Sequence, residues 1–309
     1  MAIIGFIGLG NMGLPMAQRL KDAGHEVRCF DTSSAALARA EQSGLRASAS
    51  PAAAVDGASV VITMLPSGGH VLDVLVAADL PWRDGALVID CSTIDVASCA
   101  AFHEALGNKG LATLDAPVSG GVTGAAAGTL TFMVGGTEAA FDRAQDLLHA
   151  MGKTIVHAGS AGAGQAAKIC NNMLAGISML AVSEALALAR RLGLDSRKFF
   201  EIASKSSGQC WALTSYAPEP GLVPTAPSNR DYEGGFASEL MLKDLRLAQQ
   251  AAITGRSPTP LGAAAAALYA VHCANGRGRL DFSSIILLLD PTRSRVEPKE
   301  TPCASPIAS

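Results

Sequence analysis

Charged residues are scarce in this 309-residue sequence, and it contains no run of basic residues. Only 17% of the residues are charged, 49% are hydrophobic, and the formal net charge is −3. Without a basic patch the chain has no electrostatic footprint for nucleic acid, so we expect no nucleic-acid partner. This composition also excludes an intrinsically disordered chain. It indicates a globular protein with much buried helix, long enough for two domains.

Paired cysteines are missing as well. The seven cysteines form no C-x-x-C pair, and no histidine spacing is typical of zinc, so we expect neither a disulfide framework nor a metal site. Free thiols suit a reducing compartment, and we therefore expect a cytoplasmic protein. An apolar run that predicts a strand begins at about Ala2, so we expect no signal peptide.

A glycine motif follows this first apolar run, which extends from Ala2 to Ile7 and predicts a strand buried on both faces. Gly8-Leu9-Gly10-Asn11-Met12-Gly13 comes next, before a helical pattern. G-x-G-x-x-G between a strand and a helix is typical of dinucleotide binding, because the glycines permit a tight turn, close approach of a pyrophosphate and close packing. Asp31 ends the second expected strand, where an acid binds the adenosine ribose and favours NAD over NADP. The alternative is a glycine-rich turn between ordinary elements.

Strands and helices continue to alternate through the first half of the chain. We expect strands over His25–Phe30, Val60–Met64, Ala86–Asp90, Leu111–Asp115, Leu130–Val134 and Lys153–Val156, and helices over Ala35–Gly44, Asp95–Gly107 and Thr137–Met151. The alternation predicts a parallel, doubly wound sheet, in which ligands bind beyond the carboxyl ends of the strands. The loops Leu65–Gly69 and Cys91–Thr93 are then expected at the cofactor site, with plain connections as the alternative. Ser119-Gly120-Gly121, at another strand end, either binds a carboxylate through a hydroxyl and backbone N–H groups or is a flexible loop.

A long apolar stretch from Gly162 to about Arg191 predicts a helix. It is long enough to span a bilayer, but polar residues interrupt it, so we expect a buried interior helix and no membrane association. Lys168 and Asn172 share one face of its first turns, because positions i and i+4 are neighbours on a helix. The lysine is either a helix-end cation that reaches solvent or a reactive amine.

Only helices are expected after this stretch. They cover Asp195–Lys205, Ser238–Thr254, Leu261–Asn275 and Asp281–Asp290, with an irregular loop over Pro218–Asp231. The I-I-L-L-L run of the last helix is more apolar than a surface helix would be, which favours an oligomer interface. From Pro291 to Ser309 the chain is polar and proline-rich, and a disordered tail is expected.

Four blocks make the chain resemble the 3-hydroxyisobutyrate dehydrogenases of the β-hydroxyacid dehydrogenase family. They are F-I-G-L-G-N-M-G-L-P-M-A (Phe6–Ala17), D-A-P-V-S-G-G (Asp115–Gly121), G-A-G-Q-A-A-K-I-C-N-N (Gly162–Asn172) and, after Phe236, K-D-L (Lys243–Leu245). The resemblance covers about Met1 to Asp290. It implies an NAD-binding Rossmann domain over 1–162 and an all-helical domain over 163–290, joined by the long helix, in a homodimer or homotetramer.

The resemblance also implies residue roles. Lys168 aligns with the catalytic lysine of the family, Asn172 with its substrate-orienting partner, and Ser119, Gly120 and Gly121 with the cradle of the substrate carboxylate. Trp211 and Phe236 are expected either in the substrate pocket or as packing residues. The expected cofactor contacts, besides Gly8 to Gly13 and Asp31, are Leu65, Pro66, His70, Thr93, Lys243 and Asp244. Partial burial and the nearby cation Lys243 would lower the pKa of Lys168 enough for a base near neutral pH, and no metal is required.

The implied reaction is the NAD-dependent oxidation of 3-hydroxyisobutyrate to methylmalonate semialdehyde, as in valine degradation, with Lys168 as general acid and base. Relatives that use L-serine, 3-hydroxypropionate, glyoxylate, succinic semialdehyde or tartronate semialdehyde share the carboxylate cradle, so the motifs do not select among these substrates. The S-S-G-Q-C-W segment and the proline-rich loop resemble those of bacterial members that act on 3-hydroxyisobutyrate or L-serine, which favours these two substrates. A non-catalytic NAD-binding module is the alternative from another class, and the presence of Lys168 argues against it.

Overall fold

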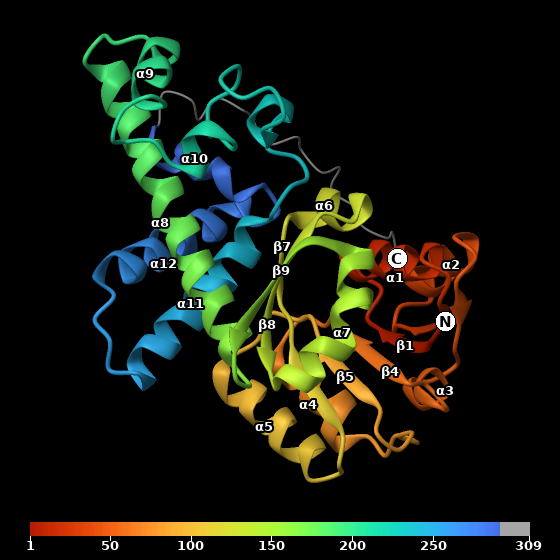
Figure 1. Ribbon diagram of the computed structural model, residues 1–309. Helices are drawn as coiled ribbons and strands as arrows, with labels where there is room; N and C mark the ends of the chain where they lie inside the picture. Colours follow the sequence, from red (N-terminus) through yellow and green to blue (C-terminus); the bar gives the residue numbers. More distant parts are fainter. Residues whose placement is uncertain (291–309) are drawn as a thin grey trace, which may run out of the picture. The chain divides into compact units, whose positions relative to one another are not determined.

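The computed structural model describes residues 1–290, which form two compact units (Figure 1). Unit 1 comprises Met1–Leu174 and Leu242–Ala266, and unit 2 comprises Ala175–Met241 and the described residues from Ala267 onward. The boundary expected at residue 162 differs from this division. The first turns of the long helix pack directly on the sheet, where a Cβ atom on Gly164 would lie 2.3 Å from the carbonyl oxygen of Met133. The tail expected over 291–309 lies outside the described residues.

Unit 1 is built on a nine-stranded sheet with the order β3-β2-β1-β4-β5-β6-β8-β7, in which β9 also pairs with β8. The strands from β3 to β6 are parallel, as the alternation predicted. However, β8 runs antiparallel to β6 and β7, because the short connection between Ser119 and Leu130 cannot make the crossover of a dozen or more residues that parallel strands need. The strands are β1 Ile3–Ile7, β2 Glu26–Phe30, β3 Arg46–Ala47, β4 Val60–Thr63, β5 Leu87–Asp90, β6 Ala112–Asp115, β7 Val118–Ser119, β8 Leu130–Gly136 and β9 Gly152–Gly159.

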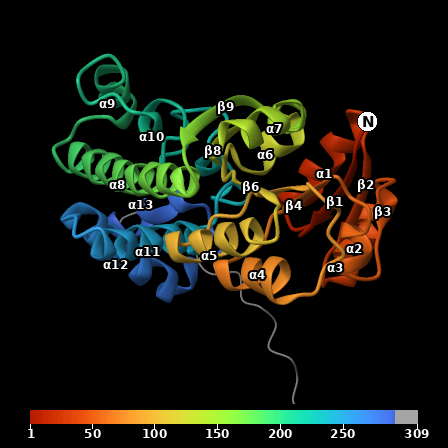
Figure 2. The same ribbon diagram turned by 60° about the horizontal axis from the view of Figure 1, so that its bottom comes forward.

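Helices cover both faces of this sheet. Successive strand residues point to opposite faces, so Phe6 and Ile62 pack with α1, α2 and α7, whereas Val61 and Val88 pack towards α3, α4 and α5. Figure 2 shows α7 on one side of the strands and α4 and α5 on the other. The helices are α1 Gly13–Asp22, α2 Ser34–Gln42, α3 Pro51–Val55, α4 Gly68–Leu72 with the π-helix η1 Asp73–Ala77, α5 Val96–Gly107, α6 Gly121–Ala127 and α7 Glu138–Met151.

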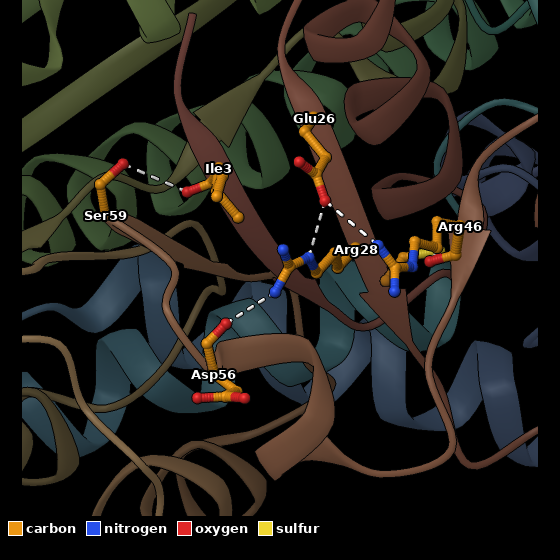
Figure 3. A network of polar contacts seen from close by, with 7 residues as sticks. Ile3, Glu26, Arg28, Arg46, Asp56 and Ser59 are labelled. Atoms are coloured by element: carbon orange, nitrogen blue, oxygen red, sulfur yellow. Dashed lines mark hydrogen bonds and ion pairs between the residues drawn. The ribbon is translucent and has the colours of Figure 1, made fainter.

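A polar network joins neighbouring strands at their amino ends (Figure 3). The carboxylate of Glu26 accepts hydrogen bonds from Arg28 Nε at 2.9 Å and Arg46 Nη1 at 3.3 Å. Arg28 Nη1 also donates to the carbonyl oxygen of Asp56 at 2.7 Å, and Ser59 Oγ donates to that of Ile3 at 3.2 Å. These contacts tie β2 to β3, and tie β1 and β2 to the connection before β4, on the edge opposite the one where ligands of such sheets bind.

Three long helices contribute residues to both units: α8 Ala163–Arg191, α11 Ser238–Thr254 and α12 Pro260–His272. Helix α8 is long and apolar enough to span a bilayer, but half of its most apolar window is buried inside the protein, as in a core helix. Unit 2 also contains α9 Ser196–Ala203, α10 Trp211–Thr214, the 3₁₀-helix η2 Pro227–Arg230 and the π-helix η3 Cys273–Arg277.

The last helical segment differs from the expected helix over 281–290. It is a 3₁₀-helix, η4 Phe282–Ile285, followed by a single α-helical turn, α13 Ile286–Leu289. Ile285, Ile286 and Leu287 are buried within the chain. The apolar run is therefore explained by internal packing, and it no longer argues for an oligomer interface. A homodimer or homotetramer stays a prediction.

Candidate active site

The glycine loop between β1 and α1 fits a dinucleotide. Gly8 has a φ of +100°, and a Cβ atom there would lie 2.3 Å from the carbonyl oxygen of Met64. A Cβ atom on Gly13 would lie 1.9 Å from the carbonyl oxygen of Gly8, whereas one on Gly10 would meet nothing within 4 Å. The backbone N–H groups of Asn11 and Met12 donate to no acceptor in the described chain. The outer glycines are therefore needed for the fold, and the open space at Gly10, beside free N–H groups at a helix start, suits a pyrophosphate.

Asp31 lies beside this loop at the end of β2. Its Oδ2 accepts a hydrogen bond from the N–H of Leu9 at 2.7 Å, and its Oδ1 accepts one from the N–H of Ser33 at 2.8 Å. The carboxylate is half-buried, and each oxygen has a further lone pair. It can therefore support the glycine loop and accept a ribose hydroxyl at the same time.

The loops after β4 and β5 are connected to each other. The N–H of Leu65 donates to Ser92 Oγ at 2.8 Å, and Ser92 Oγ donates to Asp90 Oδ1 at 2.6 Å. Lys243 Nζ, from α11, donates to the carbonyl oxygens of Pro66 at 3.3 Å and Thr93 at 2.9 Å. The structure thus brings together the predicted residues Leu65, Pro66, Thr93 and Lys243 within unit 1.

His70 and the Ser-Gly-Gly segment occupy the starts of two short helices. The exposed ring of His70 in α4 shares a hydrogen bond of 2.7 Å between its Nδ1 and Ser67 Oγ. Ser119 ends β7, and the chain turns into α6 through Gly120 and Gly121, whose φ angles are +127° and +62°. Both glycines are in the left-handed region that other residues avoid, so the turn that displays these backbone groups requires them.

Lys168 and Asn172 are buried in the first turns of α8, with 6% and 5% of their surface exposed. Asn172 Nδ2 donates to Asp244 Oδ2 at 2.5 Å, and Lys243 Nζ lies 3.6 Å from Asp244 Oδ1. The pKa of Lys168 is lowered to about 8 in total: burial lowers it most, the carboxylate of Asp244 raises it in part, and Lys243 lowers it. The predicted catalytic residues Lys168 and Asn172 therefore form one cluster with Lys243 and Asp244. The cluster contains two cations, one anion and an amide.

Trp211 and Phe236 lie in unit 2 and belong to one aromatic cluster. Trp211 stacks on Tyr216 with ring centroids 4.8 Å apart, and Phe236 meets Phe282 edge-on at 6.0 Å. Asp281 Oδ2 accepts hydrogen bonds from the hydroxyl of Tyr216 at 2.7 Å and from the N–H of Phe236 at 2.8 Å. Trp211 is 52% exposed, so it is not a core anchor. The sequence reasoning missed Tyr216 and Asp281, which no local motif distinguishes.

Two buried groups near Lys168 were also missed. Asp115 Oδ1 and Oδ2 accept the N–H groups of Gly162 and Gln165, each at 2.8 Å, at the start of α8. The side chain of Gln165 reaches the loop after β5. A signal was present, since both residues stand inside the blocks that carry the resemblance, but their partners are far away in the sequence.

Comparison with known proteins identifies the family of both parts of the chain. The family described as the NAD binding domain of 6-phosphogluconate dehydrogenase matches residues 3–159. The family described as NAD-binding of NADP-dependent 3-hydroxyisobutyrate dehydrogenase matches residues 162–289. The NAD-dependent L-serine dehydrogenase of Pseudomonas aeruginosa is 48% identical over 298 residues, which cover 94% of this chain and 99% of that protein.

Two further relatives are named 3-hydroxyisobutyrate dehydrogenase. The 3-hydroxyisobutyrate dehydrogenase of Pseudomonas aeruginosa is 49% identical over 291 residues, or 92% of this chain and 97% of that protein. The solved structure of Mycobacterium tuberculosis 3-hydroxyisobutyrate dehydrogenase with L-serine is 45% identical, has a TM-score of 0.90, and covers 94% of this chain and 99% of that chain. The chain therefore belongs to the 3-hydroxyisobutyrate dehydrogenase family and is an NAD-dependent oxidoreductase.

Proposed function

We propose that this enzyme oxidises 3-hydroxyisobutyrate to methylmalonate semialdehyde, with Lys168 as the general base. One observation carries the proposal: a buried lysine whose pKa is lowered to about 8 stands beside Lys243, Asp244 and Asn172. A lysine at its ordinary pKa of 10.5 would be protonated near neutral pH and could not accept a proton. The lowered pKa makes the neutral amine accessible at modestly alkaline pH.

Each group has a defined part in this reaction. NAD, when bound, supplies the acceptor for the hydride that leaves the hydroxyl-bearing carbon. Lys168 Nζ takes the hydroxyl proton as the C–O bond becomes a carbonyl, and in the reverse direction its ammonium returns that proton. The amide of Asn172, held by Asp244, is one helical turn away and can orient the hydroxyl. Lys243 and Asp244 then set the charge around the amine.

The binding groups follow from the geometry already described. The glycine loop from Gly8 to Gly13, Asp31 and the linked loops at Leu65, Pro66 and Thr93 hold NAD, with His70 at the margin. Ser119, Gly120 and Gly121 present a hydroxyl and backbone N–H groups to the substrate carboxylate. This anchor decides which carbon faces the nicotinamide, and such positioning contributes much of the rate.

L-serine is the second candidate substrate. It has the same β-hydroxy acid skeleton, and the relative named for L-serine is as similar to this chain as the one named for 3-hydroxyisobutyrate. Comparing kcat/KM for a panel of β-hydroxy acids decides between them, and a higher kcat/KM for L-serine would overturn the first assignment.

Lys168→Ala tests the proposed base. We expect turnover of every β-hydroxy acid in the panel to be lost while NAD still binds, because the alanine leaves the glycine loop untouched. Lys205→Ala, which removes an exposed lysine of unit 2, is the matched control and should keep wild-type kcat. Near-native kcat in Lys168→Ala would show that another group takes the proton.

A further inference from the structure

Gln165 has an unusually complete set of hydrogen bonds for a residue next to the proposed base. It is fully buried in the first turn of α8, three residues before Lys168 and therefore on a neighbouring part of the same helix face. Its Oε1 accepts from the N–H of Ile94 at 3.1 Å, and its Nε2 donates to the carbonyl oxygen of Ser92 at 2.7 Å. One side-chain amide thus satisfies both backbone groups that flank Thr93.

These bonds connect the two lysines of the site through one loop. Thr93 is the residue whose carbonyl oxygen accepts from Lys243 Nζ at 2.9 Å. Gln165 holds the residues on either side of Thr93 and stands on the helix that carries Lys168. The positions of both ammonium groups therefore depend on the loop from Ser92 to Ile94.

Asp115 makes the start of α8 rigid from the other side. Its two carboxylate oxygens accept the N–H groups of Gly162 and Gln165, so the helix start is fixed to the end of β6. A Cβ atom on Gly164 would lie 2.6 Å from the carbonyl oxygen of Asp115, which shows how closely the helix approaches the strand. The first turn of α8 is thereby held at two points, by β6 and by the loop after β5.

We propose that Gln165 is a positioning residue for Lys168: its side-chain amide clamps the first turn of α8 to the loop that holds Lys243, and so sets the geometry of proton transfer. The inference rests on the proposed role of Lys168 as the base. A buried glutamine that only fills space would need no donor and acceptor matched to two backbone groups of one loop. An amide is required because it offers one of each.

The charged surroundings allow this requirement to be tested. Asp115 on β6 accepts the N–H of Gln165, and Asp90 on β5 is buried two residues before Ser92. His103 on α5 shares a hydrogen bond of 3.0 Å with Asp115 Oδ1. In Gln165→Glu, an ionised carboxylate could accept from Ile94 but would be repelled by the carbonyl oxygen of Ser92 and by both aspartates. Once protonated, the introduced carboxyl group has the shape of the amide and one donor, so it would restore the clamp.

The experiment measures kcat and KM against pH for wild type, Gln165→Glu and Gln165→Met, with NAD and either 3-hydroxyisobutyrate or L-serine. Gln165→Met fills the space without hydrogen bonds. We expect it to lower kcat by about 10- to 100-fold, to change KM for NAD little, and to displace the pH midpoint of kcat. In Gln165→Glu the kcat relative to wild type at the same pH should rise as the pH falls. Gln250→Glu, an exposed amide on α11, is the matched control and should follow wild type at every pH.

Two results would overturn the clamp. One is wild-type kcat and pH midpoint in folded Gln165 variants. The other is a loss of kcat by the same factor at every pH, which would indicate packing alone. If Gln165→Met does not fold, the pH dependence of Gln165→Glu decides. The failure of the proposed function gives a different result from the failure of the clamp. Turnover by Lys168→Ala would show that Lys168 is not the base. If Lys168→Ala is inactive but Gln165→Glu has the kcat and pH profile of wild type, only the clamp is refuted.

Discussion

Replacing Lys168 with methionine should stabilise the folded chain near neutral pH and abolish its activity. Lys168 is 6% exposed, and burial lowers its pKa from the ordinary 10.5 to about 8. The difference, at about 1.4 kcal/mol per pKa unit, means that the protonated lysine destabilises the fold by about 3 kcal/mol. Methionine has a similar length and no charge, so it removes this cost while filling the same space.

The pH dependence gives the prediction its specific signature. The folded state binds the Lys168 proton more weakly than the unfolded state does, so wild-type stability rises with pH wherever the two states differ in protonation. The destabilisation is fully present below pH 8, where both states are protonated, and it disappears as the pH rises from about 8 to about 10.5. The advantage of Lys168→Met should therefore shrink to almost nothing across that window.

Urea denaturation of the two NAD-free proteins at several pH values measures the difference in the free energy of unfolding. Lys205→Met, at an exposed position, is the control and should show no difference from wild type that changes with pH. The reasoning would be refuted if Lys168→Met were no more stable than wild type at pH 7, or if its advantage persisted unchanged at pH 10.5. Either result would mean that burial in the folded protein does not disfavour the protonated form of Lys168.

Three other predictions follow from the same charges. The kcat for oxidation should rise with pH around a midpoint of about 8. Asp244→Asn should lower this midpoint and Lys243→Met should raise it, because the two charges act on the pKa of Lys168 in opposite directions. Shifts of equal sign in the two pH profiles would contradict this. Asp31→Ala should reduce the preference for NAD over NADP by about 10- to 100-fold, because it removes a charged hydrogen-bond acceptor. The preference is measured as the ratio of the kcat/KM values for the two cofactors. An unchanged ratio would exclude Asp31 from the ribose site. Burial raises the pKa of Asp90 from 3.8 to about 6, so the folded state binds this proton more tightly than the unfolded state does. The free energy of unfolding of wild type should therefore fall by about 3 kcal/mol as the pH rises from about 4 to about 6. The free energy of unfolding of Asp90→Asn should not show this decline.

Local patterns predicted most of unit 1. The strands β1, β2, β4, β5 and β6 were expected close to where they lie, because a short apolar run between turn residues identifies a buried parallel strand without help from distant residues. The expected starts of α2, α5 and α7 also lie close to the observed ones, where Ser33, Asp95 and Thr137 accept backbone N–H groups as caps. The expected NAD cofactor is confirmed by the family to which the chain belongs.

The direction of a strand in the sheet and the residues that cover an apolar run could not be predicted from local patterns. The reversal of β8 depends on a connection too short for a crossover, and it was missed because α6, formed by small residues and glycines, was not recognised as the whole connection. The apolar run from Ile285 to Leu287 suggested an interface because hydrophobicity alone does not say what covers it.

The sequence by itself determined the class of the protein, since the glycine motif, the strand pattern and the four blocks are each contained in short stretches of chain. It also identified Lys168 as the unusual cation of an apolar helix. Only the tertiary structure decided what surrounds that lysine. Lys243 binds the carbonyl oxygen of Thr93, 150 residues away, and Asn172 binds Asp244, 72 residues away. The pKa of Lys168 and the clamp at Gln165 arise from such contacts, because burial and charge depend on residues that folding brings together.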